Sequence, residues 1–284
     1  MGETQFAKVN GIRIAYETTG SGFPLLLLHG FPRTRRTWSR VTPALAERFT
    51  VVAADRRGYG DSERPAPPAP YDNATITEDH LQLMKLRGFE RFLVVGHDRG
   101  APVARRLATE HPDAVVGAVI MDAAPEGAGS ERPRDPSGRS WYLDFFRQRD
   151  VAEQIIGQNP RLFFSLFISR HQHLTPEEHD FYAESFARPG GTEAVLADYR
   201  AGFEVDRDYW AAEAKSGRKI QVPICAIWGE RGPSANAQVL DAWREAAVDV
   251  QGGVVPNSAH YIQEEQPEAT IRWILEFADY LRLP

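Results

Sequence analysis

The chain has 284 residues, a formal net charge of −6 and a single cysteine, Cys225. This length suits one large α/β domain with room for an inserted unit, and the charge favours neither nucleic acid nor an anionic membrane as a partner. A single cysteine excludes an internal disulfide framework, and its place in an apolar run indicates a buried thiol. No apolar run approaches the roughly 18 residues of a membrane helix, and the first turns of the chain lack the apolar core of a signal peptide. We therefore expect a cytoplasmic protein without a membrane partner.

The chain begins with a predicted β-hairpin. Phe6–Val9 and Ile12–Tyr16 flank the dipeptide Asn10-Gly11. This dipeptide tolerates the positive φ angles of a type I′ turn, so the two runs are expected to pair as antiparallel strands.

Short apolar runs then alternate with helix-like segments. The predicted strands are Leu25–Leu28, Val51–Ala54, Phe92–Val95 and Val116–Met121. The segments between them that resemble helices lie near Trp38–Arg48, Ile76–Arg87 and Ala101–Glu110. Such alternation predicts a mostly parallel sheet that helices cover on both faces.

The alternation stops after Ala124 and resumes only beyond residue 216. A loop rich in proline, glycine and charge comes first (125–139), and helical segments with many aromatic residues follow. Predicted strands return at Val222–Trp228 and Gly253–Val255, with helices near Ala235–Ala246 and Pro267–Leu281. We therefore predict a core of residues 1–124 and 217–284, with residues 125–216 inserted as a helical cap over the C-terminal edge of the sheet, where such sheets bind ligands.

The segment Gly96-His97-Asp98-Arg99-Gly100 lies between a predicted strand and a predicted helix. A tight turn flanked by small residues in this context is typical of a nucleophile elbow, with the central side chain exposed above the sheet. Asp98 is that residue, and it is ionised at pH 7 because an unperturbed aspartate has a pKa of about 3.9. A carboxylate suits attack on an sp³ carbon, since the ester that forms can be hydrolysed at its own carbonyl.

A histidine near the C-terminus is the predicted general base. His260 follows the last predicted strand, in the order nucleophile and then histidine that such enzymes have, and can activate the water that cleaves the ester. The pair His171 and His173 lacks a suitably spaced third ligand, so we expect no metal site.

Two acidic residues could orient this histidine. Asp122 follows the strand Val116–Met121, and Glu230 follows the strand that ends at Trp228. We favour Asp122, because Glu230 abuts the end of its strand rather than lying further into the loop.

The turn His29-Gly30-Phe31-Pro32 follows the first core strand. It can direct the Phe31 amide at the elbow. With the Arg99 amide, it would form an oxyanion hole for the intermediate of ester hydrolysis.

With these pieces in place, the chain resembles the α/β-hydrolase superfamily, in the branch of epoxide hydrolases and haloacetate (fluoroacetate) dehalogenases. The matching segments are His29–Pro32, Asp55–Ser62 with Pro65, Gly96–Ala101, Met121-Asp122, Ala197–Gly202, and His260 with Glu264-Glu265 and Pro267. The resemblance implies an α/β-hydrolase fold with an inserted helical cap, and an aspartate nucleophile.

The same resemblance implies roles for cap residues. Similar epoxide hydrolases use two cap side chains to donate hydrogen bonds to the epoxide oxygen, and Tyr142 and Tyr199 stand at the matching positions. In the similar dehalogenases the arginine after the nucleophile pairs with the substrate carboxylate, a role that Arg99 could fill. Those enzymes have a second arginine where this chain has Pro102, and a histidine and a tryptophan in the cap where it has Trp141-Tyr142.

We therefore predict an epoxide hydrolase without a cofactor or a metal. The predicted site consists of Asp98, His260, Asp122, Tyr199 and Tyr142 as catalytic residues, the Phe31 and Arg99 amides as the oxyanion hole, and Trp141, Arg99 and His29 as substrate contacts. The expected partner is a small molecule, an epoxide or an organohalide, and a homodimer is left open. The alternatives are a haloacid dehalogenase and, more remotely, a catalytically silent binding protein on the same scaffold.

Overall fold

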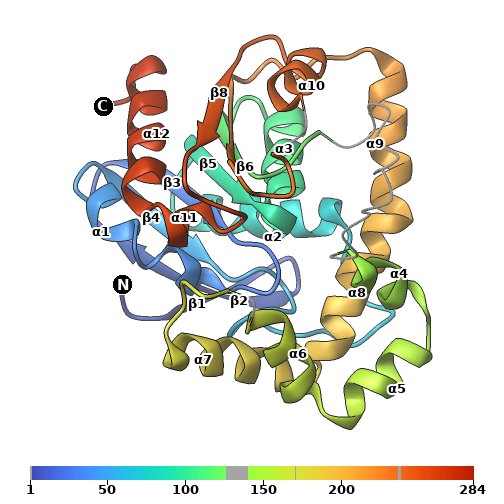
Figure 1. Ribbon diagram of the computed structural model, residues 1–284. Coiled ribbons are helices and arrows are strands. Elements are labelled where there is room, and N and C mark those ends of the chain that lie inside the picture. The colour runs from blue at the N-terminus through green and yellow to red at the C-terminus, as the bar shows by residue number, and fades with distance from the viewer. Residues whose placement is uncertain (1, 126–139, 170, 236–237) are drawn as a thin grey trace.

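A computed structural model describes residues 2–125, 140–169, 171–235 and 238–284. Its centre is an eight-stranded sheet with the order β1-β2-β4-β3-β5-β6-β7-β8 (Figure 1). The strands β1 and β2 form an antiparallel hairpin, β2 pairs antiparallel with β4, and the pairs from β4 to β8 are parallel. The strands are β1 (Gln5–Val9), β2 (Ile12–Thr19), β3 (Phe23–Leu28), β4 (Phe49–Ala54), β5 (Phe92–His97), β6 (Val115–Met121), β7 (Ile224–Gly229) and β8 (Val250–Val255).

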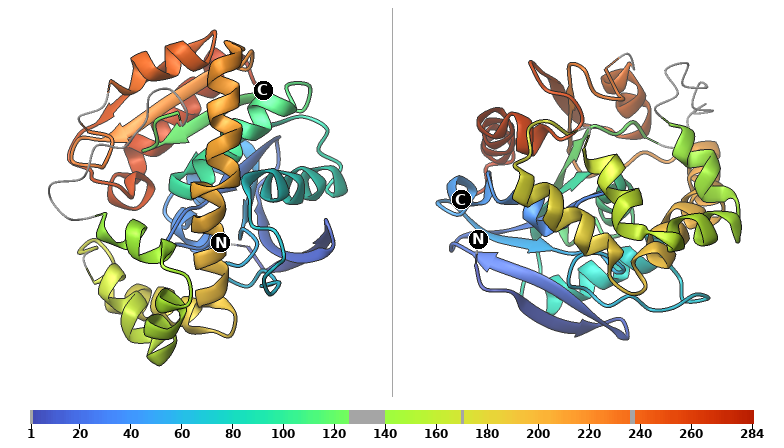
Figure 2. Two further views of the ribbon diagram at one scale, coloured as in Figure 1. Left: turned by 90° about the vertical axis from the view of Figure 1, so that its right-hand side faces the viewer. Right: turned by 60° about the horizontal axis from the view of Figure 1, so that its bottom comes forward.

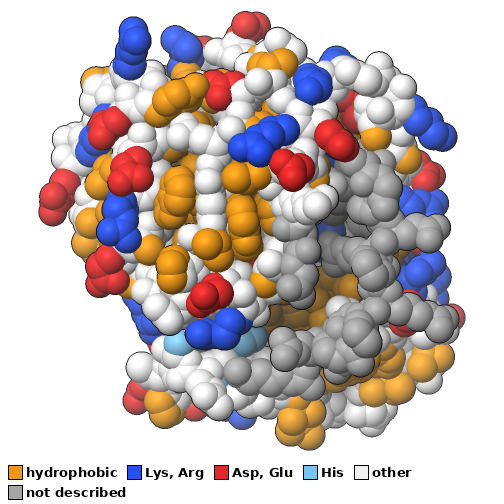
Figure 3. Space-filling model, turned by 45° about the horizontal axis from the view of Figure 1, so that its top comes forward, with side chains coloured by type: hydrophobic (Ala, Val, Ile, Leu, Met, Phe, Trp, Pro, Cys, Tyr) orange, Lys and Arg blue, Asp and Glu red, His pale blue; other side chains and the backbone are white. Residues whose placement is uncertain are grey.

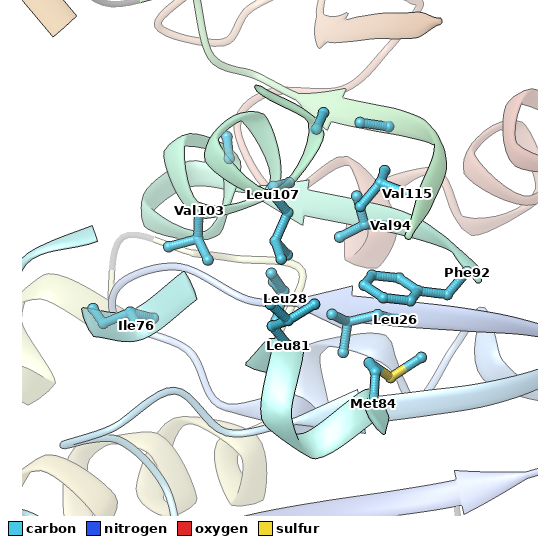
Figure 4. Close-up of a cluster of buried hydrophobic side chains, with 14 of the residues drawn as sticks. Leu26, Leu28, Ile76, Leu81, Met84, Phe92, Val94, Val103, Leu107 and Val115 are labelled. Carbon is cyan, nitrogen blue, oxygen red and sulfur yellow. The ribbon is translucent and has the colours of Figure 1, made fainter. Parts of the chain in front are cut away.

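Helices cover both faces of this sheet, as the strand–helix alternation predicts. Side chains of a strand point alternately to its two faces, so Leu26 and Leu28 of β3 pack in one apolar cluster while Leu25 and Leu27 pack in the other. The first cluster includes side chains of α2 (Asn73–Leu86), α3 (Ala101–Glu110) and α10 (Val239–Ala246), and Figure 4 shows part of it between the strands, α2 and α3. The second includes side chains next to or within the short elements η1 (Arg35–Trp38) and α1 (Thr42–Leu45) and within α12 (Pro267–Tyr280).

Among the residues that the structure describes, six helices lie between β6 and β7 and form one group beside the sheet. In Figure 1 the helices α4 to α8 occupy the lower part of the molecule and α9 rises along its right-hand side, and the right-hand view of Figure 2 brings α4 to α8 forward. The six helices are α4 (Trp141–Arg147), α5 (Val151–Gln158), α6 (Pro160–Ile168), α7 (Pro176–Ala187), α8 (Gly191–Phe203) and α9 (Val205–Ser216). We call them the inserted helices.

A third apolar cluster joins the inserted helices to the core. Phe31, just beyond the C-terminal end of β3, and Tyr59, just beyond β4, pack with buried side chains from the inserted helices. The inserted helices therefore lie over the C-terminal edge of the parallel strands, where the expected cap belongs. The loop predicted at 125–139 falls almost wholly outside the described residues, and the division at 124/125 and 216/217 stays a prediction.

Two helices differ from the sequence prediction. In place of the helix expected near Trp38–Arg48, the structure has the 3-10 turn η1 and the single turn α1. Pro43 is the second residue of α1. Proline has no amide hydrogen and clashes with the preceding turn, so it separates the two elements. A four-residue helix, α11 (Ile262–Glu265), was not predicted, because a single turn carries too little periodicity to be recognised.

The distribution of charged side chains on the surface is consistent with the small net charge of the chain. On the face drawn in Figure 3, basic and acidic side chains are interspersed around hydrophobic ones. Within the described parts of the chain, no helix is both long enough and apolar enough to cross a bilayer.

Candidate active site

Asp98 lies at the sharp turn between β5 and α3. Its backbone has a φ of 51°, in the left-handed region that non-glycine residues rarely adopt. The flanking glycines make this turn sterically feasible: a Cβ on Gly96 would approach the carbonyl oxygen of Gly100 to 2.4 Å, and a Cβ on Gly100 would approach that of Leu28 to 2.3 Å. The strained turn lifts the Asp98 side chain over the end of the sheet, as in a nucleophile elbow.

Two backbone amides contact the carboxylate of Asp98. The Phe31 N–H donates to Oδ1 of Asp98 over 2.8 Å, and the Arg99 N–H also hydrogen-bonds the carboxylate. A Cβ on Gly30 would lie 2.2 Å from Oδ1, so only glycine allows the turn after β3 to come this close. The structure thus brings together the two amides that the sequence predicts for an oxyanion hole.

His260 bridges two carboxylates. Its Nε2 lies 3.3 Å from Oδ2 of Asp98, and its Nδ1–H donates to Oδ2 of Asp122 over 2.5 Å. Asp122 follows β6 with a φ of 50°, and its side chain is fully buried. Glu230, the alternative acid, is exposed and accepts a hydrogen bond from the backbone of Asn257 instead. The acid beside His260 is therefore Asp122, as favoured from the sequence.

The charges of this group are strongly coupled. Burial lowers the pKa of His260, but the hydrogen bonds to Asp122 and Asp98 and their charges outweigh it and raise this pKa to about 10. Burial raises the pKa of Asp98, but His260 outweighs it and holds the pKa of the carboxyl well below its usual range. Asp98 is consequently an anion at neutral pH, as a carboxylate nucleophile must be.

His97 contacts the backbone of His260, and the sequence did not predict this supporting role. The Nε2–H of His97 donates to the backbone carbonyl of His260 over 2.8 Å, and the amide nitrogen of Gln263 lies 3.4 Å from its Nδ1. Burial, and then the charge of His260, lower the pKa of His97 to about 4, so its ring is neutral. His97 directly precedes Asp98 in the elbow motif. This position next to the candidate nucleophile was the sequence signal that could have identified it.

Aromatic side chains of the inserted helices pack on Phe31, whose amide contacts Asp98. The rings of Tyr142 (α4) and Tyr199 (α8) meet edge-on with centroids 5.9 Å apart, and both pack on Phe31, at 6.5 and 5.4 Å. Burial, Tyr142 and the Asp98 charge raise the pKa of Tyr199 well above its usual value, so its phenol keeps its proton. Trp141 is 45 % exposed and lines a cavity of about 40 Å³ with Phe163, Leu166 and Phe167.

The sequence comparisons agree with this architecture. The profile described as "alpha/beta hydrolase fold" matches residues 24–267. The chain is 33 % identical to a soluble epoxide hydrolase of Corynebacterium sp. (strain C12) over 97 % of both chains, and 32 % identical to a fluoroacetate dehalogenase of Burkholderia sp., over 97 % of this chain and 93 % of that one.

The chain belongs to the α/β-hydrolase family. The solved structure of the epoxide hydrolase CorEH superposes with a TM-score of 0.89 at 32 % identity, over 98 % of this chain and 99 % of that one. The resemblance to the branch of epoxide hydrolases and haloacetate dehalogenases is thereby confirmed, and the protein is a hydrolase of this kind. The identities of this chain to the two relatives, 33 % and 32 %, differ by one percentage point, so similarity alone does not choose between their substrates.

One substrate contact predicted for this α/β-hydrolase needs correction. His29 is fully buried: its Nδ1–H donates to the carbonyl of Gly30, and its Nε2 accepts from the Arg56 amide over 3.1 Å. Because both ring nitrogens are used within the core, His29 braces the turn and is not placed to touch a substrate. The role of Trp141 as a substrate contact stays a prediction.

The side chain of Arg99 extends from the elbow to α8. Its Nη2–H donates to the Asp198 carboxylate over 2.6 Å and to the Asp198 carbonyl over 2.7 Å, and 12 % of the side chain is exposed. Sequence reasoning did not single out Asp198, although it precedes Tyr199 in a matched segment. Its partner residues lie about a hundred or more positions away, so no local pattern reveals the contact.

Proposed function

We propose that this α/β-hydrolase is an epoxide hydrolase in which Asp98 forms a covalent ester with the substrate. The observation that carries the proposal is the pair of tyrosine rings, Tyr142 and Tyr199, that pack on Phe31, whose amide contacts Asp98. Two phenols can donate hydrogen bonds to one epoxide oxygen, which needs such donors when it becomes an alkoxide.

In the first step, Oδ2 of Asp98 attacks an epoxide carbon. The carbon–oxygen bond of the ring breaks, and the oxygen takes the proton of a tyrosine phenol, with Tyr199 and Tyr142 as the donors. Oδ1, which accepts the hydrogen bond from the Phe31 amide, becomes the carbonyl oxygen of the hydroxyalkyl ester.

In the second step, His260 takes a proton from a water molecule, and the hydroxide adds to the carbonyl carbon of the ester. The negative charge on Oδ1 is stabilised by the Phe31 and Arg99 amides, and such a donor is typically worth about 3 kcal/mol of barrier. Collapse of the intermediate expels the alkoxide, which takes the proton of the new carboxylic acid, so that a vicinal diol leaves and the carboxylate is regenerated. The His260 cation of the free enzyme gives its proton to the tyrosinate before it acts as the base, and the proton from water restores that cation, so the balance is epoxide plus water to diol.

The alternative is a haloacid dehalogenase, in which Asp98 displaces a halide. It is favoured by the 32 % identity to the fluoroacetate dehalogenase and by Arg99 beside the nucleophile. Against it stand Pro102, in the place of a second arginine, and the engagement of Arg99 with Asp198.

A mass measurement distinguishes the two functions. The variant His260→Gln lacks the base of the second step and should accumulate the ester. After incubation with a panel of epoxides and haloacids, the intact mass should rise by that of a whole epoxide, and peptide mapping should place the adduct on Asp98. An adduct equal to a haloacid less hydrogen halide would establish the alternative.

The control is the double variant Asp98→Asn/His260→Gln, which should remain unmodified. If H260Q forms no adduct with either panel although the wild-type enzyme turns the substrate over, the covalent mechanism is wrong.

A further inference from the structure

A buried carboxylate that has no part in these two steps lies beside Tyr199. Asp198 of α8 is fully buried, and three side chains from the core donate hydrogen bonds to it. Arg56 donates from both terminal nitrogens, over 2.9 and 3.1 Å, and the Tyr59 hydroxyl donates over 2.6 Å. Arg99 is the third donor, over 2.6 Å. Asp198 is thus the point at which an inserted helix is fastened to the loops after β4 and β5.

The Arg99 connection leads directly to the nucleophile. Its backbone amide hydrogen-bonds Asp98, while its guanidinium hydrogen-bonds both the carboxylate and the carbonyl of Asp198. The close approach depends on Gly202, one turn further along α8, where a Cβ would lie 2.6 Å from Nη1 of Arg99. A single side chain therefore joins the predicted oxyanion hole to α8.

The same helix carries the Tyr199 phenol, whose ring packs on Phe31. Tyr199 is the next residue after Asp198, and the Arg99 guanidinium lies 5.1 Å from the centre of its ring. Rotation or translation of α8 therefore moves the Tyr199 hydroxyl, and a shift of Arg99 moves the amide that contacts Asp98. Asp198 limits both movements because it binds both residues.

The charges make this carboxylate hard to replace. Arg56 is a fully buried cation and Arg99 a partly buried one, and Asp198 is the acid that both of them contact. Burial raises the pKa of Asp198, but the two guanidiniums outweigh it and hold this pKa well below its usual range. Without the negative charge, the two guanidiniums repel each other at close quarters, and Arg99 is the one that can move, because its side chain is not fully buried.

We propose that Asp198 is a positioning residue that fixes the Tyr199 phenol and the Arg99 amide relative to Asp98. The inference rests on the proposed function, since it assigns Tyr199 to the first step and the Arg99 amide to the second. It predicts that one substitution, remote from the substrate, impairs both chemical steps.

The test is the variant Asp198→Asn, with styrene oxide as the probe. Single-turnover measurements give the rate constants of ester formation and of ester hydrolysis separately. We expect both to fall by about 10- to 100-fold, less than the full loss of an oxyanion donor, with a much smaller change in KM.

The matched control is Asp79→Asn. Asp79 is also fully buried and makes a two-pronged ion pair with an arginine, Arg57, over 2.7 Å at both contacts, but it belongs to α2 and touches neither Asp98 nor the inserted helices through these bonds. D79N should lower Tm and leave both rate constants unchanged. If D198N behaves in the same way, Asp198 is only a stabilising residue and the proposal is wrong.

If D198N does not fold, Arg99→Met carries the test, since it removes the guanidinium and keeps the backbone amide. A loss of at least 10-fold in ester hydrolysis would support the proposal, and a rate equal to that of the wild type would refute it.

A crystal structure of the folded variant needs no substrate. In it the Arg99 amide or the Tyr199 hydroxyl should be displaced relative to Asp98, whereas in D79N both should stay in place. If the wild-type enzyme forms no ester from styrene oxide or other epoxides, the proposed function fails, and these structures still decide whether Asp198 positions the two groups.

Discussion

The substitution Asp98→Asn should lower the pKa of His260 by about 3 pH units. It removes the charge that lies 3.3 Å from Nε2 of His260 and keeps the shape of the side chain. At an effective dielectric constant of about 20, two unit charges at this distance interact with about 5 kcal/mol, or roughly 3 to 4 pH units. Because Asp122 stays in place, the pKa should fall from about 10 towards neutrality without reaching the value of an isolated buried histidine.

This prediction concerns the order of the two proposed steps. Ester formation neutralises Asp98 just as the asparagine does. His260 is a cation in the free enzyme and becomes a base at neutral pH only once the ester has formed, since a general base works best when its pKa lies near the operating pH. Ester formation would thus convert His260 into the base that ester hydrolysis needs.

The same shift changes the pH dependence of stability. The pKa of His260 is higher in the folded protein than in the unfolded chain, so its contribution is complete below the unfolded value of 6.5 and is lost as the pH rises through about 10. In D98N that loss should occur at lower pH, and the contribution should be smaller.

Histidine-labelled protein allows a direct assay by nuclear magnetic resonance. The chain has eight histidines, and the signal of His260 is the one missing from H260Q. The His260 ring should titrate about 3 pH units lower in D98N than in the wild type, and D79N should leave it unchanged. A difference of less than about one pH unit between D98N and the wild type would refute the electrostatic reasoning.

Three further substitutions test the rest of the site. Asp122→Asn should slow ester hydrolysis by about 100- to 1000-fold because the base loses its orienting carboxylate, whereas the control Glu230→Gln should stay within about twofold of the wild type in the same single-turnover assay. Tyr199→Phe should slow ester formation by about 100-fold in rapid-quench experiments, and the control Trp141→Phe should have little effect; equal effects would contradict the orientation of α4. Gly100→Ala should destabilise the fold by about 1–3 kcal/mol and lower the calorimetric Tm by roughly 5 °C, because its Cβ meets a strand carbonyl oxygen; an unchanged Tm would mean that the elbow is looser than described.

Much of the fold could be predicted because its signals are local. The Asn10-Gly11 turn, the apolar runs and the helix Ala101–Glu110 all appear in the structure at or near their expected places. The elements that were wrong or missed, α1 and α11, are single turns, in which proline and tertiary contacts decide the backbone rather than periodicity.

The site divides in a similar way. Asp98 was recognisable from the sequence because the elbow is a contiguous pattern: two glycines, a preceding strand and a following helix impose one backbone geometry. The choice of Asp122 over Glu230 was an inference from the positions of strand ends. It needed the structure, because His260 and Asp122 are 138 residues apart and meet only through the order of the strands.

The sequence by itself therefore determined which residues can react, since composition, short motifs and backbone sterics act over a few neighbouring residues. Tertiary structure alone decided how they are held. It placed the Tyr142 ring against that of Tyr199, left Trp141 half-exposed, and buried His29 in the core. It also joined Arg99 to Asp198 across 99 residues. Side-chain direction and buried ion pairs depend on packing between elements that are far apart in the chain, and no local pattern encodes them.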